Sequence, residues 1–270
     1  MNKLTLPAIS RLISYLSLIW YFCEMEFTKA QDILFFDIET VSQFGTYDQQ
    51  SERMKDLWTI KANSFTRSFD TPMTEAEVSE FYEKKSAIFA EFGKIVCISV
   101  ARFSVAGDNS LSLKVKSFAG HDEKQVLLDF AGMLNKRFNR EEDRICGHNI
   151  KEFDIPYLCR RMSVHKIPFP RILSLSGKKP WETSHIDTMQ YWKFGDVKHY
   201  TSLNLLSAIL GIDSPKDDID GSKVGEVYWK ENDLDRISEY CQKDAVTVAQ
   251  LYLYFNHKPL LQKEQIEYYK

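Results

Sequence analysis

The sequence predicts an α/β fold in which a mixed central β-sheet is flanked by helices. Residues 32–40 (DILFFDIET) are almost all apolar or aromatic around their acids, which is typical of a strand buried on both faces. Residues 93–103 and 111–118 are predicted to be two further strands, and the short turn between them implies antiparallel pairing. Stretches with helical spacing of apolar residues follow, and these predict the helices that cover the sheet.

The middle of the chain predicts helix, strand, helix and strand in turn. We expect a helix over 121–138 and a short strand at 144–149. The next helix opens near Ile155, because Pro156 is tolerated only in a first helical turn. A short strand is expected at 186–189.

The C-terminal part predicts two more helices. Residues 200–211 end on a glycine, which is a common stop signal for a helix. Residues 233–252 carry apolar residues at three- and four-residue steps, which indicates an amphipathic helix. Either Asn232 or Asp233 is the expected N-cap.

Residues 42–92 are long for a connection between two strands. The sequence TEAE at 74–77 has the capping-box pattern and predicts a helix to about Phe92, ended by Gly93. We expect an extra helix that covers the core, while a lid over the substrate and a partner surface remain open alternatives.

Residues 213–230 are predicted to form a loop. Lys216 and Lys223 of this loop are candidate phosphate contacts, although a solvated loop is the preferred interpretation.

Asp37 and Glu39 are the first candidate functional residues. Because side chains alternate along a strand, the two carboxylates point to the same side, two residues apart. Unpaired charge is costly in an apolar core, so a hard divalent cation such as Mg²⁺ or Mn²⁺ is expected between them. The alternative is a strand end where both acids reach solvent or pair with lysine or arginine.

Three later residues are further candidates. Asp154 stands at the entrance of the helix near Ile155, where an ordinary N-cap is the local alternative. Tyr240 and Asp244 are four residues apart and share one face of the last helix. The alternative for this pair is a boundary tyrosine beside a solvated aspartate.

Three short motifs follow one another along the chain, namely Asp37-Ile-Glu39, Asn149-x-x-x-Phe153-Asp154 and Tyr240-x-x-x-Asp244. In this order they resemble the three exonuclease motifs of the DEDD superfamily. The tyrosine indicates the Tyr subclass, because Glu239 occupies the position of the histidine in the His subclass. Residues 153–158 are similar to the second motif in the proofreading exonuclease domain of family-B DNA polymerases. The resemblance runs from about Met25 to the C-terminus and implies an RNase H-like fold.

The resemblance also implies a cofactor, namely two divalent cations, Mg²⁺ or Mn²⁺, which clamp the attacking and leaving oxygens of a phosphodiester. Asp37 would bridge both cations, and Glu39 and Asp244 would complete the site of the water-activating one. Glu39 would also meet the 3′-hydroxyl of the terminal nucleotide. Asp154 would hold the second cation, mainly through its water shell.

Four other residues receive roles from the same resemblance. Tyr240 would orient the attacking water, since a phenol with a pKa near 10 is neutral at pH 7. Thr40, Asn149 and Phe153 would contact the substrate. For Asn149, a role in holding the turn is an equally open interpretation.

The implied activity is that of a free-standing exonuclease that hydrolyses single-stranded DNA from the 3′ end and releases nucleoside 5′-monophosphates. Replication or repair is the expected setting, with a polymerase or repair complex as an expected partner. An RNA-trimming exoribonuclease of the same superfamily is one alternative. A non-catalytic nucleic-acid-binding module is another, but it predicts loss of carboxylates that are all present here. Residues 25–270 would form one exonuclease domain with a helical insertion at about 42–92.

Composition sets wider limits. A chain of 270 residues with 44% hydrophobic content supports a sizeable single core. The net charge of −3 argues against a broad basic surface that coats duplex DNA. The five cysteines form no C-x-x-C pair, and Cys97, Cys146 and Cys241 lie in apolar stretches. They predict buried thiols in a reducing compartment, which we take to be the cytoplasm. The six histidines show no zinc-ligand spacing.

Residues 1–24 are predicted to stand apart from the domain. Residues 12–22 are apolar but too short to span a membrane, so no membrane association is expected. Their length suits the apolar region of a signal peptide, yet no small-x-small cleavage site follows. We expect translation to start at Met25 and residues 1–24 not to be native structure.

Overall fold

The structure of the chain is a computed structural model that describes residues 30–65, 72–107, 110–196, 198–212 and 219–269. The expectations for residues 1–24, including a start at Met25, and for Lys216 lie outside the described residues.

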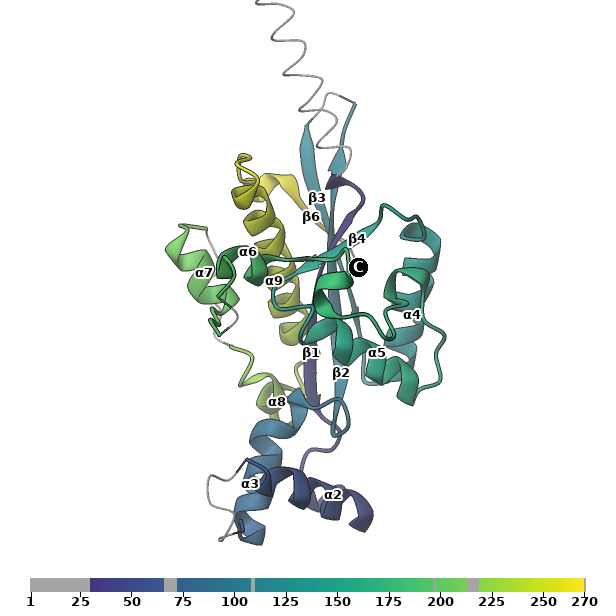
Figure 1. Ribbon diagram of the computed structural model, residues 1–270, viewed down its shortest axis with the longest axis vertical. Coiled ribbons are helices and arrows are strands. Elements are labelled where there is room, and N and C mark those ends of the chain that lie inside the picture. Colours follow the sequence, from purple (N-terminus) through teal and green to yellow (C-terminus); the bar gives the residue numbers. More distant parts are fainter. Residues whose placement is uncertain (1–29, 66–71, 108–109, 197, 213–218, 270) are drawn as a thin grey trace, which may run out of the picture.

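A mixed sheet with strand order β5-β4-β1-β2-β3-β6 forms the centre of the molecule (Figure 1). The strands are β1 (Ile33–Ser42), β2 (Gly93–Val105), β3 (Leu111–Ala119), β4 (Arg144–Gly147), β5 (Ile186–Asp187) and β6 (Ile266–Tyr269). Strands β1 and β2 pair antiparallel, as do β2 and β3. Strand β4 runs parallel to β1, β5 runs parallel to β4, and β6 runs parallel to β3. The predicted α/β class with a mixed, RNase H-like sheet is therefore confirmed.

Helices cover both faces of this sheet. The α-helices of the described residues are α2 (Glu52–Asn63), α3 (Glu75–Lys85), α4 (Glu123–Arg137), α5 (Asp154–Val164), α6 (Thr188–Lys193), α7 (Leu203–Ile209), α8 (Val224–Glu226) and α9 (Leu234–Phe255). Figure 1 shows α4 and α5 on one side of the sheet and α9, with α6 and α7, on the other. Within the described ranges, no helix combines the length and the apolar character needed to cross a membrane.

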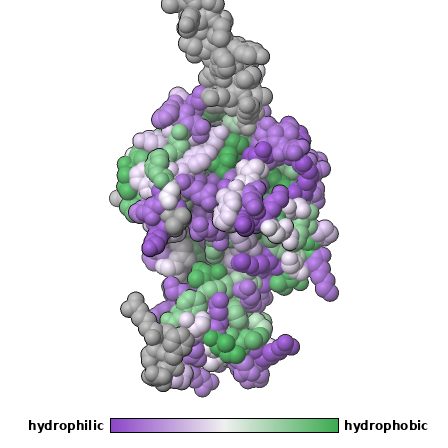
Figure 2. Space-filling model, viewed as in Figure 1, coloured by the Kyte–Doolittle hydropathy of each residue, from purple (hydrophilic) through white to green (hydrophobic). Residues whose placement is uncertain are grey.

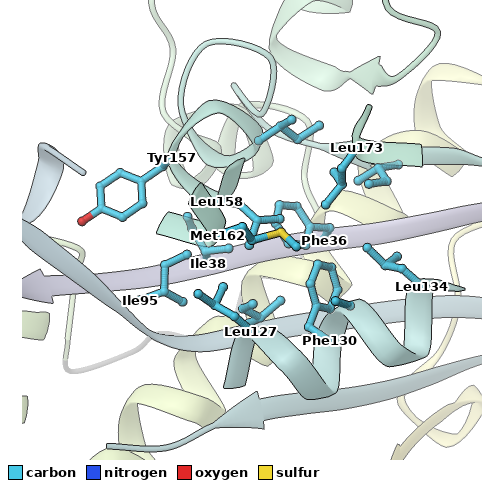
Figure 3. Packing of buried hydrophobic residues seen from close by; sticks show 14 of the residues in the cluster. Phe36, Ile38, Ile95, Leu127, Phe130, Leu134, Tyr157, Leu158, Met162 and Leu173 are labelled. Atoms are coloured by element: carbon cyan, nitrogen blue, oxygen red, sulfur yellow. The ribbon is translucent and has the colours of Figure 1, made fainter. Parts of the chain in front are cut away.

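The alternation of side chains along β1 divides the core into two layers. Phe36 and Ile38 face α4 and α5, and Figure 3 shows Phe36 beside Phe130 of α4, with ring centroids 5.6 Å apart. Ile33 and Phe35 point the other way and pack in the cluster that α9 completes. Continuing the alternation, Asp37 and Glu39 stand on the face of β1 that α9 covers.

A buried ion-pair network joins α4 to α5 on the opposite face. Arg161 donates two hydrogen bonds to the carboxylate of Glu123, at 2.8 and 2.6 Å. Glu123 also accepts the backbone N–H of Ile95 at 2.8 Å and lies 2.7 Å from Nε2 of His165. Because every oxygen of the buried carboxylate is used, this network fixes the start of α4 against α5 and β2.

Most predicted elements are confirmed by the structure. The three long strands, the short strand before residue 148 and the helices predicted over 121–138, 200–211 and 233–252 are all present, with ends shifted by a few residues. Of the two candidate caps of α9, Asp233 is the N-cap, since it accepts the N–H of Arg236 at 3.0 Å. Gly211, which follows α7, has a φ of +67°, the left-handed conformation that favours glycine at a helix end.

The secondary structure differs from the expectations in four respects. The strand predicted at 186–189 lasts only two residues, because the carboxylate of Asp187 accepts the N–H of Met189 and starts α6. The loop predicted at 213–230 becomes helical from Val224 as α8 and a π-helical turn, Val227–Glu231, since Val224 and Val227 are buried. Helix α2 and strand β6 were not predicted, because neither shows the apolar periodicity of a core element.

The fourth difference concerns the insertion at 42–92. The capping box at Thr74 is present, but α3 ends at Lys85 rather than at Phe92. Helices α2 and α3 do not cover a face of the sheet; they pack on each other beyond the end of β1 and β2 (Figure 1). Trp58 is fully buried between them and donates its Nε1–H to the carbonyl of Val78 at 3.1 Å. Figure 2 shows hydrophobic residues gathered on this projecting part, where Ile60 is 69% exposed.

Candidate active site

The site forms where β1 and β4 end side by side. The two strands run parallel, with Phe35 opposite Cys146, so the chain leaves β4 next to Asp37. A Cβ on Gly147 would lie 2.0 Å from Cγ2 of Ile150 and 2.9 Å from the carbonyl oxygen of Phe36. Glycine is therefore required there, and its absence of a side chain lets the following turn lie against β1.

Asp187 holds this turn from the neighbouring strand β5. Its carboxylate accepts the N–H of Asn149 at 2.9 Å and the N–H of Lys151 at 3.2 Å. Asn149 adopts a left-handed φ of 65°, which asparagine tolerates better than most residues. Asn149 thus holds the turn through its backbone and also lines the cavity described below. Asp187 was missed in the sequence, because an acid at the end of a short strand carries no distinctive pattern.

Asp154 follows the turn as the first residue of α5. The N-cap is Phe153, which makes no side-chain capping hydrogen bond, so the N-cap interpretation of Asp154 is wrong. Asp154 is buried, which raises the pKa of its carboxyl to about 7. Backbone hydrogen bonds from Asp154 and Ile38 oppose this rise in pKa, and the charges of Asp187 and Asp244 add to it.

Helix α9 brings the last candidates to the same place. Ile237, Cys241 and Ala245 are buried against the sheet, and this places Cys241 directly over β1. The Cys241 thiol donates to Oδ2 of Asp37 at 3.3 Å. One ligand atom from each of Asp37, Glu39 and Cys241 lies within 4.8 Å of the others. The sequence indicated only a buried thiol at Cys241, because nothing in the pattern shows which strand it meets.

A cavity of about 950 Å³ contains all of the predicted site residues. It is lined by Asp37, Glu39, Thr40, Asn149, Phe153, Asp154, Tyr240 and Asp244. The register of β1 against β2 shifts between Glu39 and Thr40, and this β-bulge re-aims the strand at the cavity wall.

Other segments complete the wall of the cavity. Ala87 and Ile88 come from the end of the 42–92 insertion, and Tyr200 comes from the segment before α7. Lys223 also lines the cavity, and its side chain is exposed to solvent there. His148, which was not singled out, lines the wall and has a pKa lowered by burial.

The carboxylates of the cavity repel one another. Burial raises the pKa of Asp37 and of Glu39 well above the usual range, and the charge of Asp244 is the next cause in both cases. Within the described part of the chain, no lysine or arginine forms an ion pair with Asp37, Glu39 or Asp154. Three neighbouring carboxylates that form no ion pair with lysine or arginine fit divalent cations, which favour hard oxygen ligands.

The same carboxylates also affect the pKa of Tyr240. Burial raises the pKa of its phenol, and the charges of Asp244, Glu39 and Asp37 raise it further. The phenol therefore stays protonated at neutral pH and can donate a hydrogen bond but cannot act as a base.

Comparison with known proteins connects this site to a family. A family model described as "Predicted 3'-5' exonuclease related to the exonuclease domain of PolB" matches residues 88–267. The matched range contains Asp154, Tyr240 and Asp244 and begins after Asp37 and Glu39. This match confirms the predicted resemblance to the exonuclease domain of family-B DNA polymerases.

Among solved structures, the chain is similar to the family B DNA polymerase from the hyperthermophilic archaeon Pyrobaculum calidifontis, with 16% sequence identity and a TM-score of 0.48. The alignment covers 82% of this chain and 24% of the polymerase, so the chain spans about a quarter of that protein's length. None of the curated proteins compared with the chain matches it.

Proposed function

This chain belongs to the family of predicted 3′-5′ exonucleases related to the exonuclease domain of PolB, and from that premise we propose that it hydrolyses single-stranded DNA from the 3′ end and releases nucleoside 5′-monophosphates. The observation that carries the proposal is the gathering of four carboxylates and one protonated phenol around a single cavity. Such a set matches the needs of phosphodiester hydrolysis at a strand end.

The proposal includes two divalent cations, Mg²⁺ or Mn²⁺, as cofactors. Asp37, Glu39, Asp154 and Asp244 would hold them, because these carboxylates line one cavity and raise one another's pKa. When bound, the two cations would stabilise the charge that develops on the attacking and leaving oxygens.

The protein groups of the proposed Tyr subclass site then have separate tasks. Tyr240 would donate or accept a hydrogen bond with the attacking water and orient it toward phosphorus, since its raised pKa keeps the phenol neutral. Glu39 would also receive the 3′-hydroxyl of the terminal nucleotide. The thiol of Cys241 would hold one carboxylate oxygen of Asp37 in place through its hydrogen bond.

Substrate contacts would come from the walls of the cavity. Thr40, Asn149 and Phe153 are proposed to touch the terminal nucleotides, and Lys223 would approach a phosphate. Single-stranded rather than duplex nucleic acid is favoured by the concave site and by the net charge of −3. DNA is preferred over RNA because residues 153–158 resemble the second motif of DNA-proofreading domains.

The alternative of an RNA-trimming enzyme is tested in the same experiment as the main proposal. Matched single-stranded DNA and RNA oligonucleotides, labelled at the 5′ end, are incubated with the protein in Mg²⁺ or Mn²⁺. The proposal expects a ladder that shortens from the 3′ end faster for DNA, with nucleoside 5′-monophosphates recovered by chromatography. Faster shortening of RNA would favour the exoribonuclease, and no shortening of either strand would overturn the proposal.

The biological setting belongs to the proposal as well. Buried free thiols at Cys97, Cys146 and Cys241 suit a reducing compartment such as the cytoplasm. Replication or repair, with a polymerase or repair complex as partner, is the setting in which an exonuclease of this family would meet single-stranded 3′ ends. Co-purification of the tagged full chain under native conditions tests the partner, and recovery of no replication or repair protein would contradict it.

A further inference from the structure

A second cavity, of about 620 Å³, lies on the side of α5 that faces away from the sheet. Figure 3 shows Leu158 and Met162 of α5 pointing toward Phe36, into the core. Pro156, Cys159, Arg160 and Ser163 share another side of the same helix and line this cavity. The segment from Phe169 to His185 forms its opposite wall. The volume is in the range of sites that bind small organic ligands.

The charged residues of this cavity are all cationic. Lys151, Arg160 and Lys178 line it, and no aspartate or glutamate does. Throughout the described residues, none of these three side chains forms an ion pair. Burial lowers the pKa of Lys151, and the charge of Asp187 only partly opposes this effect. A bound anion would complement all three charges.

The remaining walls are mainly apolar, and one of them is aromatic. Phe169 is 42% exposed at this cavity, and Leu173, Leu175 and Ile155 lie beside it. An exposed phenylalanine in a cationic cavity suits a ligand that has both a flat apolar group and a negative charge. A nucleotide has this combination, with a base that stacks on an aromatic ring and a phosphate that pairs with lysine or arginine.

The second cavity is also a neighbour of the active site. Asn149 and Phe153, on the turn held by Asp187, line the catalytic cavity, whereas Lys151 of the same turn lines the second one. Asp154 and Ile155, which follow each other at the start of α5, likewise face the first and the second cavity. The two cavities are therefore lined by neighbouring residues of one short turn and of the start of α5.

We propose that this second cavity binds a nucleotide unit, with its base against Phe169 and its phosphate on Arg160 and Lys178. Two sources share this chemistry. One is an upstream nucleotide of the strand whose 3′ end occupies the catalytic cavity, a case that rests on the proposed function. The other is a free nucleoside monophosphate, which requires no hydrolysis by this protein.

The test uses the full chain with Asp244→Asn in Mg²⁺, so that strands stay intact, and follows binding by fluorescence anisotropy and calorimetry. The probes are a 12-nucleotide strand, a 4-nucleotide strand and a nucleoside 5′-monophosphate. The pocket variants are Phe169→Ala and the double variant Arg160→Ser with Lys178→Ser. The matched control is Lys136→Ser with Arg137→Ser, two exposed cations at the end of α4.

For the strand source, we expect both pocket variants to bind the long strand at least about tenfold more weakly while the short strand is unaffected. The double variant removes the contact to one phosphate, so it should also reduce the slope of log affinity against log salt by about 0.7, the value for one neutralised phosphate of a single strand. For the free-nucleotide source, the pocket variants lose the monophosphate and bind both strands normally.

Equal binding of all three probes by the pocket variants and the control would overturn the proposal, as would a parent protein that binds none of the probes. Far-UV circular dichroism and a thermal midpoint check that Phe169→Ala is folded, and the double variant changes only exposed residues. Failure of the proposed exonuclease function can be distinguished from failure of this proposal. It would appear as a strand that the wild-type chain does not shorten, independently of how the pocket variants bind the probes.

Discussion

The thiol of Cys241 lies against the carboxylate of Asp37, with Sγ 3.3 Å from Oδ2, and this contact joins α9 to β1 beside the cavity that Asp37 lines. The same thiol lies 3.5 Å from the backbone carbonyl oxygen of Asp37. The hydrogen bond works against the rise in the pKa of Asp37 that burial causes. Cys241 therefore positions an acid that the proposed mechanism uses, although it is not itself expected to touch the substrate.

Replacing Cys241 should lower activity without abolishing it. Cys241→Ala removes one hydrogen bond to Asp37, so we expect kcat to fall about threefold to tenfold, in line with a bond of roughly 1 kcal/mol. Cys241→Ser keeps a donor at this position and should recover most of the rate. Steady-state kinetics on a labelled strand decide this, and equal rates for the alanine and serine variants would contradict a positioning role.

Removing the phenol of Tyr240 should affect the chemical step more than binding. Tyr240→Phe keeps the ring and loses the group that would orient the attacking water, so we expect kcat to fall about tenfold to hundredfold with KM little changed. Tyr254→Phe, on an exposed position of the same helix, is the matched control. A Tyr240→Phe enzyme with normal kcat and a raised KM would show that the tyrosine binds substrate instead.

Repulsion among the carboxylates should lower the free energy of unfolding of the metal-free protein. Asp37 is repelled by Asp244, Glu39 and Asp154, so Asp37→Asn should raise the free energy of unfolding by about 1 to 2 kcal/mol when divalent cations are removed with EDTA. Adding Mg²⁺ or Mn²⁺ should stabilise the wild type and have little effect on this variant.

Urea unfolding with and without the cation measures both effects. Asp235→Asn, an exposed acid in the first turn of α9, is the control and should respond to the cation like the wild type. A lower free energy of unfolding for Asp37→Asn in EDTA would contradict the idea that repulsion among the carboxylates destabilises the metal-free protein.

The Glu123 network should make stability depend on pH in the acid range. Burial alone would raise the pKa of Glu123, but the hydrogen bonds and charge of Arg161 outweigh burial and lower it, with help from Ile95 and His165. Because the folded-state pKa lies below the unfolded value of 4.5, this stabilisation is present above about pH 4.5 and is lost as pH falls through the folded pKa.

Glu123→Gln should therefore cost about 3 kcal/mol at pH 7, since it leaves the buried Arg161 without its carboxylate. The difference from the wild type should shrink as pH is lowered toward 3 in the same urea unfolding measurements. The exposed variant Glu83→Gln is the matched control. A difference that stays constant across this pH range would contradict the lowered pKa of Glu123.

Local patterns in the sequence were sufficient for the central strands and for α9. Alternation fixed the faces of β1, and a three- and four-residue period fixed the buried face of α9, because both elements pack on the main core. Helix α2 escaped prediction because its Trp58 packs in a separate small core with Tyr82, where a periodic stripe is not required. Strand β6 escaped for a similar reason, since it is short and mostly exposed at the sheet edge.

Some residues of the candidate site could be predicted from the sequence and others could not. Residues that form a spaced motif, such as Tyr240 and Asp244, could be found in the chain, and the structure brings them to the cavity of Asp37. Asp187 and Cys241 could not, because their roles depend on contacts made across the sheet to Asn149 and Asp37. Only the three-dimensional arrangement shows such partners.

The most direct test of the central claim compares two aspartates on one helix. Wild type, Asp244→Asn and Asp235→Asn are incubated in Mg²⁺ or Mn²⁺ with a 5′-labelled single-stranded DNA, and shortening from the 3′ end is followed on a denaturing gel. We predict that wild type and Asp235→Asn shorten the strand at similar rates, that EDTA stops both, and that Asp244→Asn is slower by about a hundredfold or more. Normal shortening by Asp244→Asn would contradict the assignment of the carboxylate cavity as the active site.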